Sequence, residues 1–261
     1  MAQPYIRLQN VAKVYDTKGG TVEACVDINL DVRQSEFVAI VGPSGCGKTT
    51  ILKMVAGLVP YSAGTITVGS NVVDRPQTDV GIVFQDAIML DWRDVISNVM
   101  LQIDIRRMDR TKYRPVAAHL LRQTGLEGFE RKKPYELSGG MRQRVSICRA
   151  LVHDPPLLLM DEPFGALDEI NRNKLDADLI SLWWQKKLTV VFVTHSIYEA
   201  VFLSTRVVVM SARPGRVLKE VAIDEPHPRG DAWRVTQRFA AYAKELSELL
   251  AEASAKGTTD L

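Results

Sequence analysis

Short apolar runs alternate with helical patterns along most of the chain. The runs have the length and the β-branched content of buried strands, and they lie at residues 37–41, 81–84, 157–160, 189–193 and 207–210. The helical patterns between them cover residues 49–56, 137–153, 169–186 and 197–202. Because strands that alternate with helices form parallel sheets, this pattern predicts an α/β fold with a mostly parallel core sheet.

Three parts of the chain depart from this alternation. Near the N-terminus, residues 5–8, 28–32 and 65–68 alternate apolar and polar positions, which predicts half-exposed antiparallel strands with a turn at Lys18-Gly19-Gly20. From Val95 to about Gly128 the pattern is helical, which predicts a helical insertion. Near the C-terminus, an apolar stripe of Val235, Phe239, Ala243 and Leu246 predicts an amphipathic helix.

Composition and charge narrow the function classes. The formal net charge is +2, and the longest basic run is Arg131-Lys132-Lys133, so no strong field for nucleic acid is expected. The cysteines at 25, 46 and 148 show neither metal-ligand spacing nor a disulfide framework, which favours a reducing compartment. No apolar run approaches the roughly 20 residues of a membrane span, and the N-terminus does not have the pattern of a secretory signal. We therefore expect any membrane association to come through a partner.

A phosphate-binding motif follows the first buried strand. The pattern G-x-x-x-x-G-K-[ST] is met by Gly42, Pro43, Ser44, Gly45, Cys46, Gly47, Lys48 and Thr49, between a strand and a helix. The glycines let successive backbone N–H groups point at phosphate oxygens, and the helix N-terminus adds partial positive charge. Lys48 is expected to reach the β- and γ-phosphates, and the Thr49 hydroxyl is expected to ligate Mg²⁺.

Polar residues stand where other buried strands end. Asp161 and Glu162 end the run at 157–160, Gln85 ends the run at 81–84, and His195 follows the run at 189–193. Ligands bind at the carboxyl ends of strands in open α/β sheets. Asp161 is expected to hold Mg²⁺, and Glu162 is expected to act as a general base or to orient the attacking water. Gln85 is compatible with a metal and water ligand or with a simple loop residue, and His195 with a phosphate contact or with a structural role.

A second anion site is predicted at Ser138-Gly139-Gly140. The two glycines and the capping hydroxyl stand at a helix N-terminus, which attracts anions. The chain already has one phosphate loop, so this site is expected to serve a phosphate bound on another copy.

These motifs, in this order, resemble the ATP-binding subunit of an ABC transporter over nearly the whole chain. Gly42–Thr49 resembles Walker A, Gln85 the Q-loop, and Leu137–Met141 the signature motif of the family. Leu157–Glu162 resembles Walker B, Gly165–Asp168 the D-loop, and His195 the switch histidine. The resemblance implies ATP and Mg²⁺ as ligands, with Gln85 as a further metal ligand and with Thr50 and Asp168 at the nucleotide. Packing and base stacking are both open for Tyr15 from the residues alone, and the resemblance favours stacking on adenine.

The resemblance also implies the organisation of the chain. It predicts a single domain, 1–261, with a RecA-like P-loop NTPase core, an antiparallel β subdomain and a helical subdomain. Residues 1–85 would hold the β subdomain and the P-loop, and 86–154 the helical subdomain with the signature. Residues 155–210 would return to the core, and 211–261 would form a C-terminal turn and helix. Two copies would form a head-to-tail homodimer.

Three shorter stretches resemble importers of nitrate, sulfonate, taurine and related solutes. They are Leu90–Arg93, Phe164–Asp168 and Ala212–Arg216, with Asp91 where the usual pattern has proline. This implies integral-membrane permease partners at the cytoplasmic face of the inner membrane, and indirectly a periplasmic or extracellular solute-binding protein. The alternatives are a soluble ABC ATPase acting on nucleic acid or ribosomes, and an exporter cassette.

Two side chains carry local expectations. Cys46 lies at a helix N-terminus, where a thiol pKa tends to fall, so it is either a reactive thiol protected by ATP or a small buried residue. Trp92 is expected to be an exposed anchor for a short helix of the permease, rather than a core residue.

Overall fold

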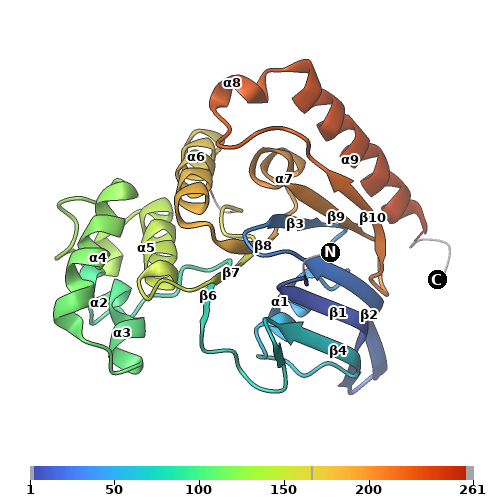
Figure 1. Cartoon of the computed structure of the whole chain (residues 1–261), viewed down its shortest axis with the longest axis horizontal. Helices are drawn as coiled ribbons and strands as arrows, with labels where there is room; N and C mark the ends of the chain where they lie inside the picture. Colours follow the sequence, from blue (N-terminus) through green and yellow to red (C-terminus); the bar gives the residue numbers. More distant parts are fainter. Residues whose placement is uncertain (1–2, 166, 257–261) are drawn as a thin grey trace.

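A mostly parallel sheet forms the centre of the molecule, with the strand order β10-β9-β3-β8-β7-β6 (Figure 1). The computed structural model describes residues 3–165 and 167–256. The parallel strands are β3 (Phe37–Val41), β6 (Val80–Val83), β7 (Leu157–Asp161), β8 (Thr189–Val193) and β9 (Arg206–Met210). Only β10 (Val217–Ala222) runs antiparallel to its neighbour, β9. The predicted parallel core is confirmed, and β3, β7 and β8 are buried along their whole length.

A second, antiparallel sheet packs below the first in Figure 1, in the order β2-β1-β4-β5. It consists of β1 (Ile6–Thr17), β2 (Gly20–Val32), β4 (Ala63–Val68) and β5 (Asn71–Val72). Buried Ile6, Leu8 and Val11 face a core shared with α1 (Lys48–Val55) and one side of the central sheet. The predicted antiparallel strands are therefore confirmed, although β1 runs past Tyr15 to Thr17.

A helical subdomain projects from the core on the left of Figure 1. It contains α2 (Val95–Val99), α3 (Leu101–Ile105), α4 (Arg110–Gln123), a 3-10 turn (Pro134–Glu136) and α5 (Gly139–Leu151). The helical pattern that begins at Val95 is divided into three helices. Asp94 and Asp109 accept backbone N–H groups at the starts of α2 and α4, and Met100 separates α2 from α3. Val95, Val99 and Ile103 are fully buried, as their shared face predicts.

Helices α6 (Glu169–Lys186) and α7 (Ile197–Leu203) cover the other side of the central sheet. Phe37, Phe164, Phe192 and Trp183 pack together beneath them. A short helix, α8 (Asp231–Arg234), leads into α9 (Gln237–Lys256), which packs on α7 and β9 (Figure 1).

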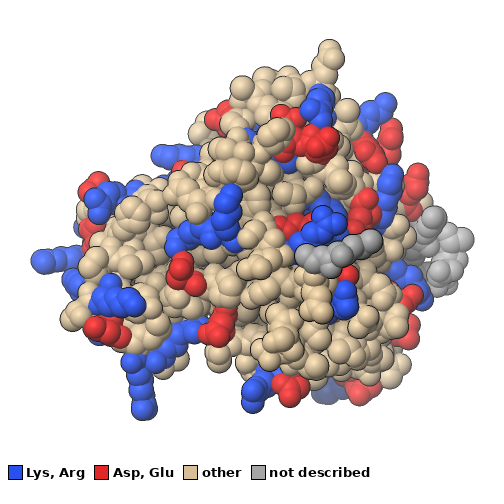
Figure 2. All heavy atoms as spheres, viewed as in Figure 1, with Lys and Arg blue, Asp and Glu red and all other residues tan. Residues whose placement is uncertain are grey.

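The C-terminal region departs from the predicted pattern. Strand β10 was not predicted, because its residues Lys219 and Glu220 interrupt the apolar run of an edge strand that is exposed on one face. The assignment of Val235 to the buried stripe was wrong: it caps α8 and is 88% exposed, whereas Phe239, Ala243 and Leu246 are buried. None of the helices in the described part of the chain has the length and apolarity of a membrane span. Charges of both signs are interspersed on the face shown in Figure 2.

Candidate functional site

The phosphate loop joins β3 to α1, as predicted, and its backbone requires glycine. Gly45 and Gly47 have φ of 75° and 94°, in the left-handed region. A Cβ on Gly47 would stand 2.9 Å from the carbonyl oxygen of Ala24, and a Cβ on Gly42 would stand 2.8 Å from Sγ of Cys46. Larger residues would therefore fill the cradle and displace the loop.

A pocket of about 280 Å³ opens beside this loop. It brings together predicted site residues from distant parts of the chain: Tyr15, Ser44, Gly45, Gly47, Lys48, Thr49, Thr50 and Glu162. Val22, Ala24 and Arg213 complete its lining. Lys48 is buried and donates hydrogen bonds to the carbonyls of Gly42 (2.9 Å) and Pro43 (3.0 Å). The pocket thus combines a glycine cradle and an ammonium group, which fits a phosphate chain.

Asp161 and Thr49 are in direct contact at the end of β7. The Thr49 hydroxyl donates a 2.9 Å hydrogen bond to Oδ1 of Asp161. Burial raises the pKa of the Asp161 carboxyl, and this hydrogen bond opposes the rise. A hydroxyl and a carboxylate are hard oxygen donors, so the pair fits a Mg²⁺ ion beside the phosphates.

Glu162 and His195 form the next contact along the sheet edge. Nδ1 of His195 lies 3.2 Å from Oε2 of Glu162, and the Glu162 side chain is 23% exposed. The Glu162 backbone has φ of 44°, which is uncommon for a residue with a side chain. Its N–H donates to the carbonyl of Val193 at 2.9 Å, which fixes it against the neighbouring strand. An imidazole in contact with a carboxylate at a pocket wall can orient that carboxylate toward water.

The predicted second anion site lies in a separate hollow. Ser138, Gly139, Gly140 and Asp168 line it together with Met141, Arg144, Leu167 and Asn171. Ser138 caps α5 as predicted, because its Oγ accepts the N–H of Met141 at 3.3 Å. Asp168 caps α6 through the N–H of Asn171, and the Asn171 side chain lowers the pKa of the Asp168 carboxyl. No residue lines both this hollow and the P-loop pocket.

Gln85 does not line the P-loop pocket. It lies in a third hollow with Asp86, Ile88, Gly139 and Arg142, between the end of β6 and the start of α5. Gly139 and Leu167 line both this hollow and that of the signature residues, whereas none of the described residues is shared with the P-loop pocket.

Cys46 is a buried residue. Its side chain has no exposed surface, and burial raises its thiol pKa although the Lys48 ammonium group opposes the rise. Lys48 Nζ lies 3.9 Å from Sγ. The expectation of a lowered pKa was therefore wrong, because desolvation outweighs the helix terminus here, and the buried alternative describes Cys46.

Sequence reasoning missed three charged residues around the site. Glu199 is buried and accepts a hydrogen bond from Thr194, the residue before His195. Arg172 lies 3.4 Å from Glu199 and donates to the carbonyl of Leu167, so it connects the strand end to the D-loop-like segment. Arg213 reaches the P-loop from the turn between β9 and β10. None of these residues lies in a nucleotide motif, and the only signal in the sequence was the Ala212–Arg216 stretch.

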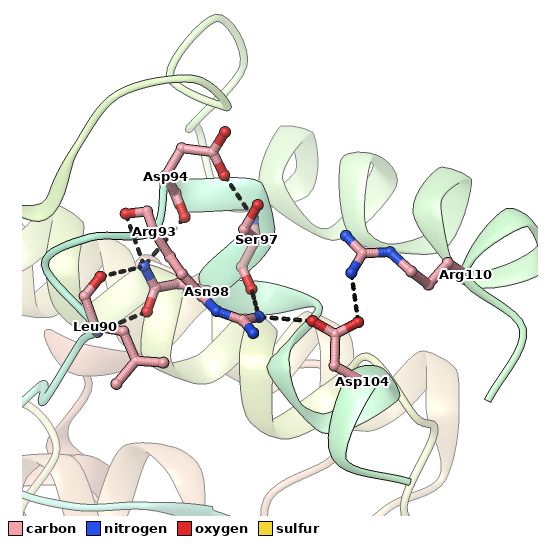
Figure 3. Close-up of polar contacts among 7 residues, drawn as sticks. All are labelled: Leu90, Arg93, Asp94, Ser97, Asn98, Asp104 and Arg110. Atoms are coloured by element: carbon pink, nitrogen blue, oxygen red, sulfur yellow. Dashed lines mark hydrogen bonds and ion pairs between the residues drawn. The ribbon is translucent and has the colours of Figure 1, made fainter. Parts of the chain in front are cut away.

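The loop after β6 is held rigidly on the helical subdomain. Buried Asn98 accepts the N–H of Leu90 and donates to the carbonyls of Leu90, Arg93 and Asp94 (Figure 3). Arg93 in turn contacts Asp104 at 2.6 Å, and Asp104 also binds Arg110 (Figure 3). Trp92 projects from this loop with 74% of its surface exposed, and Ile88 is 68% exposed. The expected exposure of Trp92 is confirmed.

Comparison with known proteins gives the family. The sequence model of the family described as ABC transporter matches residues 25–165, which is more than half of the chain. An uncharacterized ABC transporter ATP-binding protein of Methanocaldococcus jannaschii is 43% identical over 94% of this chain and 91% of its own length. A taurine import ATP-binding protein of Rhizobium johnstonii is 44% identical, over 89% and 90%. An aliphatic sulfonates import ATP-binding protein of Bacillus cereus is 40% identical, over 86% and 88%.

A solved structure agrees with these relatives. The dimeric structure of a bacterial ABC transporter cassette superposes with a TM-score of 0.76 at 32% identity, covering 85% of this chain and all of that one. A related dimeric structure, at TM-score 0.75, is described as a post-hydrolysis state bound to ADP and Pi. Motif order, sheet topology and these similarities agree: the chain belongs to the ABC transporter family and is the ATP-binding subunit, an ATPase, of an ABC transporter.

Proposed function

We propose that this ATPase drives the import of a small organic solute of the taurine or aliphatic sulfonate class. The observation that carries the proposal is identity of 40–44%, over most of both chains, to subunits named for taurine and aliphatic sulfonate import. The permease would lie in the bacterial inner membrane, with this subunit on its cytoplasmic face. A binding protein outside the membrane would deliver the solute.

The residues of the P-loop pocket would have different roles in ATP hydrolysis. The loop N–H groups and Lys48 bind the phosphates, and the oxygens of Thr49 and Asp161 hold Mg²⁺, which when bound neutralises phosphate charge. Glu162 accepts a proton from the attacking water or orients it, and His195 fixes the Glu162 carboxylate from 3.2 Å away. Tyr15 lines the same pocket and offers its ring to adenine.

Two copies would complete each site in a head-to-tail dimer. Supporting this, Ser138, Gly139 and Gly140 line a hollow distinct from the P-loop pocket, so they are free to face a nucleotide held by a partner. Asp168 in the same hollow would contact the partner beside that nucleotide. Gln85 would reach Mg²⁺ and water only when its segment moves toward the P-loop, because it lies in a third hollow.

Uptake measurements test the importer assignment. A strain lacking this chain should lose growth on taurine or alkanesulfonates as sole sulfur source, and the intact chain should restore growth. Lys48→Ala should not restore it, because the phosphates lose their counter-charge. Normal growth of the deletion strain on every such compound would contradict the proposed solute class. It would not contradict the assignment of the chain as an ATPase.

A further inference from the structure

The Ala212–Arg216 segment forms a wall of the nucleotide pocket. It is the turn between β9 and β10, and it is closed by the Ser211 N–H, which donates to the carbonyl of Arg216 at 2.9 Å. The Ser211 hydroxyl accepts the N–H of Arg216 at 2.9 Å and donates to the carbonyl of Pro214 at 3.2 Å. The turn is therefore internally braced.

The braced turn is also fixed to its surroundings. Gly215 exchanges backbone hydrogen bonds with β2, donating to Ala24 at 3.1 Å and accepting from Val26 at 3.0 Å. A Cβ on Gly215 would stand 1.9 Å from the carbonyl oxygen of Cys46, so only glycine allows the turn to approach the P-loop this closely. The position of Arg213 is thus set relative to the phosphate loop.

Arg213 points along the loop and into the pocket. Its Nε donates to the carbonyl of Gly45 at 3.2 Å, and its Nη2 lies 3.0 Å from the place a Cβ on Gly45 would take. Within the described residues, Arg213 makes no ion pair. Among the residues that line the pocket, Lys48 and Arg213 are the cations.

The contact with Gly45 places Arg213 at the phosphate end of the pocket, because Gly45 belongs to the loop whose N–H groups bind phosphate. A guanidinium group presents paired N–H donors that match two phosphate oxygens, and it keeps its charge at all physiological pH values. Holding Nε on a carbonyl leaves the terminal N–H groups for a ligand. We propose that Arg213 is a second cationic ligand of the nucleotide phosphate chain, outside the P-loop motif. The proposal rests on the proposed assignment of this pocket to ATP.

Equilibrium binding of the non-hydrolysed analogue β,γ-imido-ATP to the purified chain tests the proposal. Arg213→Ala should raise its Kd by about tenfold, the scale of one charged hydrogen bond. The Kd of Arg213→Lys should lie between those of the parent and of Arg213→Ala, because the lysine keeps the positive charge but does not have the paired N–H donors. The loss should shrink at high salt, since the side chain is exposed.

Arg216→Ala is the matched control, because Arg216 belongs to the same turn, is exposed and does not line the pocket. Its Kd should stay within about twofold of the parent, the scatter of an exposed surface change. An Arg213→Ala effect no larger than that of Arg216→Ala overturns the proposal. Lys48→Ala separates the role of Arg213 from the assignment of the pocket to ATP. If Lys48→Ala abolishes binding while Arg213→Ala changes Kd no more than Arg216→Ala does, only the role of Arg213 fails. If Lys48→Ala leaves binding unchanged, the assignment of the pocket to ATP fails as well.

Discussion

At the scale of single residues, Glu162 combines an uncommon backbone conformation with a half-buried position at the wall of the pocket. A non-glycine residue in the left-handed region costs on the order of 1 kcal/mol, and such conformations persist where the surroundings fix them. Here the fixing contacts are the N–H bond to Val193 and the imidazole of His195. The strained conformation turns the carboxylate out of the β7 direction and into the pocket.

Glu162→Gln should separate ATP binding from hydrolysis. The substitution keeps the shape and removes the base, so the hydrolysis rate should fall by roughly 100-fold or more. ATP should still bind, because Lys48 and Thr49 are unchanged, and the trapped nucleotide should shift the chain from monomer to dimer in size-exclusion chromatography. Adding Ser138→Arg should abolish that shift. Hydrolysis at the parent rate would falsify the assigned role of Glu162.

His227 is a second residue whose environment has a measurable consequence. Its ring lies 4.7 Å from the Trp183 ring and stacks on Trp184, and neither ring nitrogen has a hydrogen-bond partner among the described residues. Burial lowers its pKa from 6.5 to about 3, with Arg229 acting in the same direction. Between about pH 3 and pH 6.5, His227 therefore binds fewer protons in the folded chain than in the unfolded chain.

The free energy of unfolding should decrease as the pH falls, because His227 must take up a proton in a buried site. The contribution of neutral His227 is fully present above its unfolded pKa and is lost as the pH falls toward 3. At about pH 5 the loss is on the order of 1–2 kcal/mol. His227→Phe should flatten the decline of Tm between pH 7 and about pH 4, whereas His119→Gln, at an exposed site, should leave it as steep as in the parent. Parallel curves for the parent and His227→Phe would show that His227 does not carry the acid sensitivity.

At the scale of elements, the β9–β10 turn shows how a short segment shapes a distant site. Gly215→Ala would bring Cβ against the carbonyl of Cys46, 1.9 Å away, so the turn or the P-loop must move. Unfolding should become easier by about 1–3 kcal/mol, the usual cost of overpacking, and nucleotide affinity should fall with it. Gly230→Ala is the control, because nothing lies within 4 Å of its added Cβ. Chemical denaturation and nucleotide titration of both variants measure the difference.

The elements that the sequence predicted well are those with continuous patterns. Buried runs such as Leu157–Met160 are apolar throughout, and motifs such as Gly42–Thr49 fix both a strand end and a helix start. β10 could not be predicted, because an edge strand with one exposed face carries charged residues. The place of Arg213 could not be predicted either, since it depends on the approach of a turn to a loop 168 positions away in the chain. The burial of Cys46 could not be predicted for the same reason, because Gly215 of this turn packs against the Cys46 backbone.

At the scale of the whole molecule, hydrolysis and coupling would use different surfaces. The P-loop pocket lies at the carboxyl ends of interior strands of the central sheet. Trp92 instead projects from the loop after β6, which Asn98 holds on the helical subdomain through the hydrogen bonds drawn in Figure 3. A large exposed aromatic residue on a rigid loop is typical of an interface anchor.

Trp92→Ala should uncouple transport from hydrolysis. The isolated variant should keep near-normal ATPase activity, because Trp92 does not line the P-loop pocket, but reconstituted transport with the permease should be lost. Val235→Ala, at an apolar site that is 88% exposed and outside the helical subdomain, is the control and should transport normally. Intact transport by Trp92→Ala would refute the docking role.

The separation of Ser138-Gly139-Gly140 from the P-loop pocket has a genetic consequence. In a head-to-tail dimer, a Lys48→Ala copy still contributes an intact Ser138-Gly139-Gly140 segment to the partner's site. A Ser138→Arg copy still contributes an intact P-loop to its own site. When both alleles are expressed in one cell, mixed dimers pair one doubly damaged site with one intact site. Each allele alone should be inactive, whereas the heterozygous cell should recover part of its ATPase activity. Two alleles that damage the same half of the site, Lys48→Ala and Thr49→Ala, should not rescue each other.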